Sequence, residues 1–238
     1  VFHPFVFAAD AFVIMNRTEN FSAEQTISFR FKCPVINDGR NIAATWNWRT
    51  KPVFSKKSNL VYQLNSTNSP YAYDSGGLTI EEVKLDRTSA RQRNIDYKTK
   101  ERVKHLKTGL SWSLDINERA NIQSFAFYQH RDFYSLLPFG FGGVISLDKD
   151  VFGFGSRLQN KKTQNNYINT FQLGFDYSNQ KDRRDRYRNN SGEEGENVFS
   201  QLEKFSSFGL YVLNQAEFEN GVLLRLGSRF DSNKIGTD

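Results

Sequence analysis

The sequence is poor in the residues that build disulfides and metal sites. It has one cysteine, Cys33, which excludes an internal disulfide and a cysteine-bound zinc ion. Its three histidines, His3, His105 and His130, are far apart in the chain and lack the spacing of metal ligands. We therefore expect no metal and no cofactor.

Long apolar runs are missing as well. No apolar run of about 18 residues occurs, so the sequence contains no candidate transmembrane helix. The hydrophobic fraction, 38%, is low for a packed globular core, although 22 residues are Phe. The net charge of +6 does not indicate a nucleic-acid partner, because the basic residues are spread along the chain among 26 acidic ones.

What the sequence does have is alternation. Between Lys204 and Asp231, apolar residues occupy every second position in two runs, which the turn Glu219-Asn220-Gly221 separates. Strict alternation is typical of a strand with one apolar and one polar face. The apolar positions are Phe208, Leu210, Val212, Val222, Leu224, Leu226 and Phe230, and the polar positions include Arg225, Arg229 and Asp231.

The same pattern recurs along most of the chain. It predicts strands at Glu24–Lys32, Arg40–Arg49, Asn59–Asn65, Arg102–Ile116, Ala120–Arg131, Val151–Gln159 and Tyr167–Tyr177. The segment Ala120–Arg131 is irregular, because the apolar Phe125 and Phe127 fall on the same face of the strand as the polar Gln123 and Gln129.

The expected connections alternate between short and long. Those expected to be short are Asn117–Arg119, Lys161–Asn166 and Glu219–Gly221, and those expected to be long are Ser66–Glu101, Asp132–Asp150 and Gln180–Glu203. In an up-and-down antiparallel sheet, this order places every long connection at one end. The sequence therefore predicts an all-β fold, a section of about nine or ten strands of a transmembrane β-barrel with long extracellular loops and short periplasmic turns.

Two of the long connections carry further local signals. Thr79 followed by Glu82 has the spacing of a capping box, which predicts a short helix near Thr79–Arg87. Residues Gln180–Glu196 are dense in charge, which predicts a solvated, mobile loop.

Three segments carry motifs in a particular order. Ser69–Asn94 contains P-Y-A-Y-D-S-G-G-L-T followed by an acidic stretch and a D-R pair, Phe171–Tyr187 contains F-Q-L-G-F-D-Y-S, and Gly209–Asp231 ends in L-G-S-R-F-D. The first resembles a loop, and the other two resemble barrel segments, of TonB-dependent outer-membrane receptors of the iron-complex branch. The resemblance covers roughly Asn59–Asp231, and the motifs are more specific in their order and spacing than singly.

This resemblance implies a function and a set of partners. The family takes up ferric siderophores or similar iron chelates across the outer membrane of Gram-negative bacteria, driven by TonB acting on a plug domain, and its members are not enzymes. Outer-membrane lipid and lipopolysaccharide are the other expected partners. No plug motif is visible, so we expect a fragment in which residues 35–238 belong to the barrel and residues 1–34, which match no family motif, have room for one or two strands.

The expected ligand contacts lie in the long loops, where aromatic rings and arginines together suit a bulky anionic chelate. These candidates are Tyr71, Tyr73, Arg91, Arg93, Phe133, Tyr134, Phe139, Phe141, Arg183, Arg184, Arg186 and Arg188. The run from Arg183 to Arg188 could instead meet lipopolysaccharide, and for any single residue a plain polar loop is as good an interpretation.

Other conspicuous side chains have a structural interpretation. We expect Arg157, Arg225, Arg229 and Asp176 to face the lumen, where pairing with Asp115, Asp176 or Asp231 is favoured over contact with a plug or ligand. We expect Trp46, Trp48, Trp112, Tyr177 and Phe218 to face lipid or to form the interfacial aromatic girdles. No catalytic constellation is present.

Two alternatives remain open from the residues alone. A passive porin or an adhesin would share the alternation. A soluble β-sandwich binding module would pack the face of Phe171, Leu173 and Phe175 against that of Leu106, Leu110 and Trp112.

Overall fold

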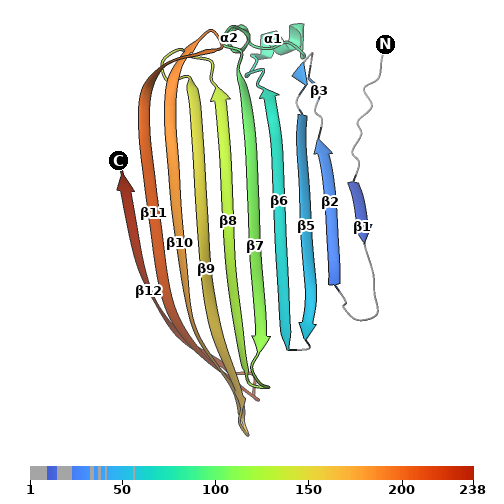
Figure 1. Cartoon of the computed structure of the whole chain (residues 1–238), viewed down its shortest axis with the longest axis vertical. Coiled ribbons are helices and arrows are strands. Elements are labelled where there is room, and N and C mark those ends of the chain that lie inside the picture. The colour runs from blue at the N-terminus through green and yellow to red at the C-terminus, as the bar shows by residue number, and fades with distance from the viewer. Residues whose placement is uncertain (1–9, 15–22, 33–34, 37–38, 41, 56) are drawn as a thin grey trace.

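The computed structural model describes residues 10–14, 23–32, 35–36, 39–40, 42–55 and 57–238 (Figure 1). Ten of the strands form one sheet, and all neighbours are antiparallel. They are β1 (Asp10–Ile14), β2 (Ala23–Lys32), β5 (Ile42–Ser55), β6 (Ser58–Tyr73), β7 (Lys100–Asp115), β8 (Ala120–Leu136), β9 (Val144–Thr163), β10 (Tyr167–Asn190), β11 (Glu193–Phe218) and β12 (Leu223–Thr237). The predicted up-and-down antiparallel architecture is confirmed.

Two short strands stand apart from this order. β3 (Val35–Ile36) pairs with β4 (Gly39–Arg40) as a separate two-stranded sheet between β2 and β5. In the main sheet every strand pairs with the next one along the chain, so β1 and β12 are the two outer strands. Cys33 and His3 lie outside the described residues, as do the side chains of Trp46 and Trp48.

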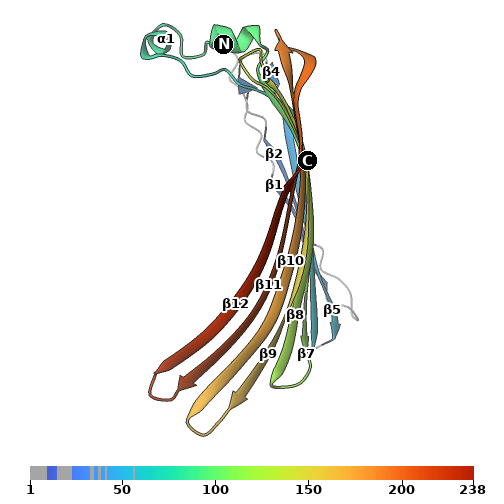
Figure 2. The same ribbon diagram turned by 90° about the vertical axis from the view of Figure 1, so that its left-hand side faces the viewer.

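The sheet is one curved wall (Figure 2). The lower ends of β9 to β12 bend toward the same side as the helix α1 (Ile80–Leu85), so the wall has a concave and a convex face. Figure 1 looks onto the convex face. Within the described residues, no helix has the length and apolar character needed to cross a membrane.

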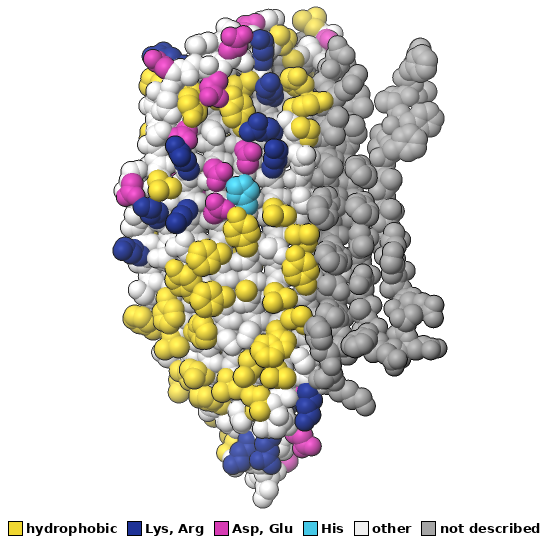
Figure 3. Space-filling model, in the orientation of Figure 1, with side chains coloured by type: hydrophobic (Ala, Val, Ile, Leu, Met, Phe, Trp, Pro, Cys, Tyr) yellow, Lys and Arg dark blue, Asp and Glu magenta, His cyan; other side chains and the backbone are white. Residues whose placement is uncertain are grey.

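The alternation of the sequence separates the two faces. Leu173 of β10 lies opposite Leu158 of β9 and Val212 of β11, so apolar side chains line up across three strands on the convex face. Gln172 lies opposite Gln159 on the concave face. Figure 3 shows the result as a band of apolar side chains with charged side chains above it.

The apolar side chains are not covered by a second layer. Leu110, Trp112, Phe171 and Leu173 are 42%, 37%, 39% and 43% exposed. The apolar residues that count as buried among those described are only Ala120, Leu136 and Val144. The sandwich alternative is therefore wrong, because the two sets of residues that it would pack against each other lie on the same open face of one sheet, with two strands between them.

The ends of the sheet correct the predicted connections. The short turns expected at Asn117–Arg119 and Glu219–Gly221 are confirmed, and the turn between β9 and β10 is shorter than expected. Between the strands from β6 onward, only residues 74–99 form a long connection. Asp132–Asp150 was expected to be a long loop but is mostly strand, and so is Gln180–Glu203, where β10 and β11 meet in a two-residue turn at Ser191 and Gly192. These strands run on because cross-strand pairing continues above the apolar band, through a stretch of mostly polar and charged residues.

Candidate functional site

The connections at one end of the sheet lie close together. We call this the projecting end: residues 74–99, which contain α1 and α2 (Gln92–Asp96), residues 137–143, and the tip of the β10–β11 hairpin. Figure 1 shows these segments gathered above the strands, and Figure 2 shows α1 extending over the concave side. The short turns lie at the opposite end.

Asn189, which is 2% exposed, ties three of these segments together. Its Nδ2 donates to the carbonyl oxygens of Leu137, at 2.9 Å, and Tyr97, at 3.3 Å. Its Oδ1 accepts from the N–H of Gly192 at 2.6 Å. Sequence reasoning missed Asn189 because two of its partners, Tyr97 and Leu137, come from distant connections.

The predicted helix is confirmed as α1. The side chain of Thr79 accepts from the N–H of Glu82 at 3.2 Å, and the Glu82 carboxylate accepts from the N–H of Thr79 at 2.7 Å. After the helix, hydrogen bonds from the hydroxyl and N–H of Thr88 hold the pKa of Asp86 below its ordinary value. The helix therefore has local hydrogen bonds at both of its ends.

The arginine run does not form a mobile loop, because Arg183, Arg184, Arg186 and Arg188 all lie in β10. Successive residues alternate between faces, so Arg183 lies on the convex face and Arg184 on the concave face. Three of the four have partners: Arg183 lies 3.3 Å from Asp185, Arg184 lies 3.5 Å from Glu203, and Arg188 pairs with Glu196 and covers the ring of Phe141. The run is therefore not a single cluster of free cations.

The other eight candidates divide between strands and connections. Tyr71 and Tyr73 end β6 with ring centroids 6.1 Å apart, and Phe133 and Tyr134 belong to β8. The remaining four, Arg91, Arg93, Phe139 and Phe141, do lie in the connections. Arg91 and Arg93 are exposed and form no ion pair within the described part of the chain.

The concave wall carries the predicted lumen residues. Arg229 of β12 forms a bidentate pair with Asp176 of β10, with both N–O distances 2.9 Å, and lies 2.7 Å from Asp231. Its guanidinium also covers the ring of Tyr211, while Arg157 donates to Gln123. Arg229 therefore pairs with carboxylates of the same wall, and Arg225 is exposed on the same face, opposite Gln215.

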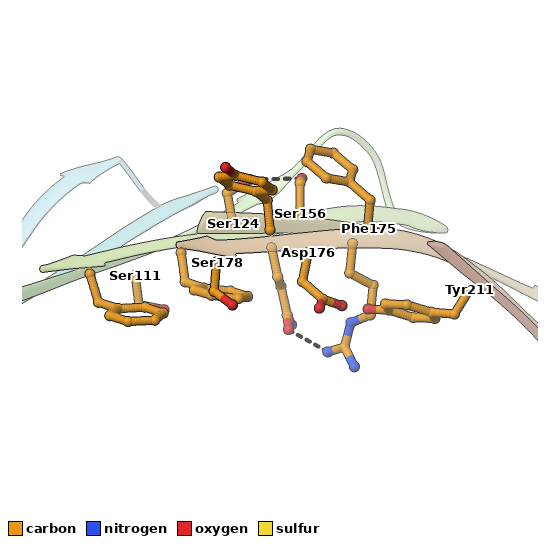
Figure 4. A pocket seen from close by; sticks show the side chains of 12 residues that line it. Ser111, Ser124, Ser156, Phe175, Asp176, Ser178 and Tyr211 are labelled. Atoms are coloured by element: carbon orange, nitrogen blue, oxygen red, sulfur yellow. Dashed lines mark hydrogen bonds between the residues drawn. The ribbon is translucent and has the colours of Figure 1, made fainter. Parts of the chain in front are cut away.

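Aromatic rings lie flat on this polar wall beside glycines. Phe125 faces Gly155 and Phe127 faces Gly153, and a Cβ on either glycine would stand within 2.7 Å of the ring opposite. Figure 4 shows the arrangement around a hollow of about 540 Å³, with Asp176, Ser178 and Tyr211 on one side of the sheet and Phe175 on the other. Phe125 and Phe127 can therefore lie on the polar face because the glycines opposite them on the next strand leave room for their rings.

Among the described residues, three buried polar atoms in one row of the concave face have no hydrogen-bond partner. They are Nε2 of His105, Nε of Arg131 and Oδ1 of Asp182, and they belong to one row that crosses β7 to β10. Lys149 stands in the same row, with its Nζ 3.4 Å from Oδ2 of Asp182.

No protein-family model matches the chain, and no curated protein matches it at a significant level. Solved structures do match. The unliganded ferric citrate transporter FecA matches with a TM-score of 0.76 at 14% identity, over 96% of this chain and 35% of that one.

Two further structures match over 96% of this chain. The ferric-catecholate import receptor Fiu from E. coli K12 matches with a TM-score of 0.69 at 8% identity, and the match covers 42% of the length of Fiu. BauA, the ferric preacinetobactin receptor from Acinetobacter baumannii, has a TM-score of 0.69 at 9% identity, with 39% of its length. The chain therefore spans less than half the length of each of these three proteins.

These matches define the class of fold. The chain has the fold of a section of the barrel wall of such receptors, and its resemblance to TonB-dependent receptors is confirmed at the level of the fold. Of the three proteins, one is a transporter and two are receptors.

Proposed function

We propose that this chain forms part of the wall of a transporter in the outer membrane of a Gram-negative bacterium, and that the transporter takes up an iron chelate such as a ferric siderophore. The observation that carries the proposal is the division between an apolar convex face and a charged concave face on the same strands. A wall between lipid and a wet lumen needs this division.

The convex face has the properties of a lipid contact. From Phe171 to Tyr177 the apolar positions of β10 span about 20 Å at ~3.4 Å per residue, close to the ~25 Å apolar band of outer-membrane barrels. Polar groups on this face pair with one another: Ser124 bonds Ser156 at 2.9 Å, and Trp112 donates to Ser58 at 2.9 Å. Such pairing is required where no water is available.

The ligand side is the concave face together with the projecting end. Arg91 and Arg93 are exposed at that end, and Phe141 is 68% exposed. Cations and an exposed ring suit an anionic, aromatic-bearing chelate. The printed ligands of the matched proteins, ferric citrate, a ferric catecholate and ferric preacinetobactin, support an iron chelate.

The remaining partners follow from the same arrangement. Residues with charged side chains stand on the convex face just above the apolar band, among them Lys104, Arg102, Lys181 and Arg183. They suit the anionic headgroups of lipopolysaccharide. We propose TonB as the energy source, acting through a plug domain in the whole protein.

Binding and uptake by the whole protein test the proposal. We compare Arg91→Gln/Arg93→Gln with the matched control Lys161→Gln/Lys162→Gln, which removes the same charge at the opposite end of the sheet. Weaker binding of a ferric chelate in the first variant alone supports the assignment, as measured by quenching of intrinsic fluorescence. Equal affinities in both variants would remove these arginines from the site.

Dependence on TonB separates this function from a passive porin. Iron-chelate uptake should be lost in a host without TonB if the proposal is right. Uptake that persists there, or conductance through the purified protein in planar bilayers without any energy source, would favour the porin alternative.

A further inference from the structure

A compact block of ionisable side chains lies on the convex face, on the side away from the proposed ligand path. His130 and Asp132 of β8 stand opposite Asp150 and Asp148 of β9. Residues two apart in a strand share a face, so the four side chains form a square on neighbouring strands. The block lies just above the apolar band, because Tyr128 and Phe152 form the next row below.

Three members of the block bring ligand atoms together. One ligand atom each from His130, Asp148 and Asp150 lies within 4.8 Å of the other two. Nδ1 of His130 is 3.1 Å from Oδ1 of Asp150, and that same oxygen accepts a hydrogen bond from the Tyr128 hydroxyl at 2.6 Å. Tyr128 therefore fixes the orientation of one carboxylate from outside the cluster, as partners of metal ligands do.

Cations border the block, with Lys104 opposite Asp132 and Lys181 opposite Asp150, yet among the described residues Asp148 has no ion-pair partner. Asp132 and Asp148 face each other directly, a placement that is unfavourable for like charges. Arg102 lies 3.3 Å from Asp132, but Arg183, which stands opposite Asp148, lies 3.3 Å from Asp185 instead. Within the described residues Asp148 is exposed and has no hydrogen bond or ion pair.

We propose that His130, Asp148 and Asp150 bind a divalent transition-metal ion of the zinc class. One imidazole nitrogen and two carboxylate oxygens form a ligand set that such ions accept, with water in the remaining positions. Two carboxylates supply the charge that neutralises the ion. Bond lengths of about 2.0–2.2 Å require the ligand atoms to close in slightly, which rotation of the exposed Asp148 and the partly exposed His130 and Asp150 permits.

Sequence analysis does not predict this site, because its ligands come from two strands. His130 is 18 residues from Asp148 and 20 from Asp150, so no ligand spacing is visible along the chain. Hairpin pairing between β8 and β9 brings them together. The site goes beyond the proposed function and depends on the register of one hairpin, not on the identity of the transported chelate.

Titration of the metal-free whole protein in detergent with Zn²⁺, in the absence of any iron chelate, tests the site. We expect His130→Gln and Asp148→Asn each to raise the Kd for Zn²⁺ by about tenfold or more, as loss of metal-site groups does. Absorption of bound Co²⁺ in the visible range should fall in parallel in both variants.

Two matched controls make the result specific. His105→Gln removes the histidine on the other face of the wall, and Asp132→Asn removes the carboxylate of the block that pairs with Arg102. Both should leave the Kd for Zn²⁺ within about twofold of the parent, and thermal unfolding confirms that each variant is folded. Equal Zn²⁺ affinity in the parent and in the double variant His130→Gln/Asp148→Asn would overturn the proposal, as would equal losses in the controls.

Discussion

Leu173 and Gln172 are neighbours in β10, but their side chains lie on opposite faces of the sheet and in opposite surroundings. Leu173 stands among leucines and valines and is 43% exposed with no layer over it. Gln172 donates to Gln159 at 3.1 Å on a wall of arginines, aspartates and flat aromatic rings. Adjacent residues of one strand thus have opposite surroundings, so the effect of a substitution should depend on which face of the sheet the residue occupies.

The largest effect is expected from a charge placed on the convex face. Leu173→Arg should destabilise the protein in a bilayer by about 2–4 kcal/mol, because a cation in the apolar band loses its hydration. Gln172→Arg, the control one residue away, should change the free energy of unfolding by less than about 1 kcal/mol. Urea unfolding in liposomes measures both, and equal losses would contradict the division of faces.

The flat aromatic rings of the concave face give the next effect. A Cβ in Gly153→Ala would stand 2.6 Å from the Phe127 ring and 2.9 Å from the backbone oxygen of Tyr177, so we expect a cost of about 1–3 kcal/mol. Gly109→Ala is the control on the same face, where the nearest atom is 3.8 Å away. Unfolding of both variants in liposomes decides whether close packing, rather than glycine itself, matters.

The hydrogen-bonded hydroxyls of Ser124 and Ser156 test whether water reaches the convex face. Ser124→Ala leaves the Ser156 hydroxyl without its partner, which should cost about 1 kcal/mol if lipid covers the pair. The double variant Ser124→Ala/Ser156→Ala should recover most of that loss, because no polar group is then left unpaired. A thermodynamic cycle without such recovery would indicate that water reaches this face.

The smallest effect is expected for an ion pair on the wet face. Asp176→Asn weakens the bidentate pair with Arg229, yet both side chains are partly exposed, at 34% and 43%, and Asp231 remains as a partner. We expect a loss of only about 0.5–1 kcal/mol, and less at high salt. A larger, salt-independent loss of unfolding free energy would show that this part of the wall excludes water.

Features fixed by local sequence were predictable. Alternation placed the strands, because a period of two residues directly encodes a two-faced sheet. The capping box placed α1, because its two hydrogen bonds join residues three apart. Both signals lie within a single segment.

Features that depend on neighbouring strands were not predictable. The high charge of residues 180–196 predicts a loop. In the structure, Lys181 to Arg186 instead pair residue by residue with β9 and β11. Phe125 and Phe127 lie on the polar face, and only the pairing of strands shows that Gly155 and Gly153 lie opposite them. Asn189 has partners that are close only after the projecting end has formed.

Spin labels along β10 test the central claim most directly. Labels at Gln172, Leu173, Phe175, Tyr177 and Ser178 in the whole protein, with Cys33→Ser as background, report access to oxygen dissolved in lipid and to a water-soluble nickel chelate. Positions 173, 175 and 177 should favour oxygen, while 172 and 178 should favour nickel. Equal access to the nickel chelate at all five positions would contradict a wall between lipid and water.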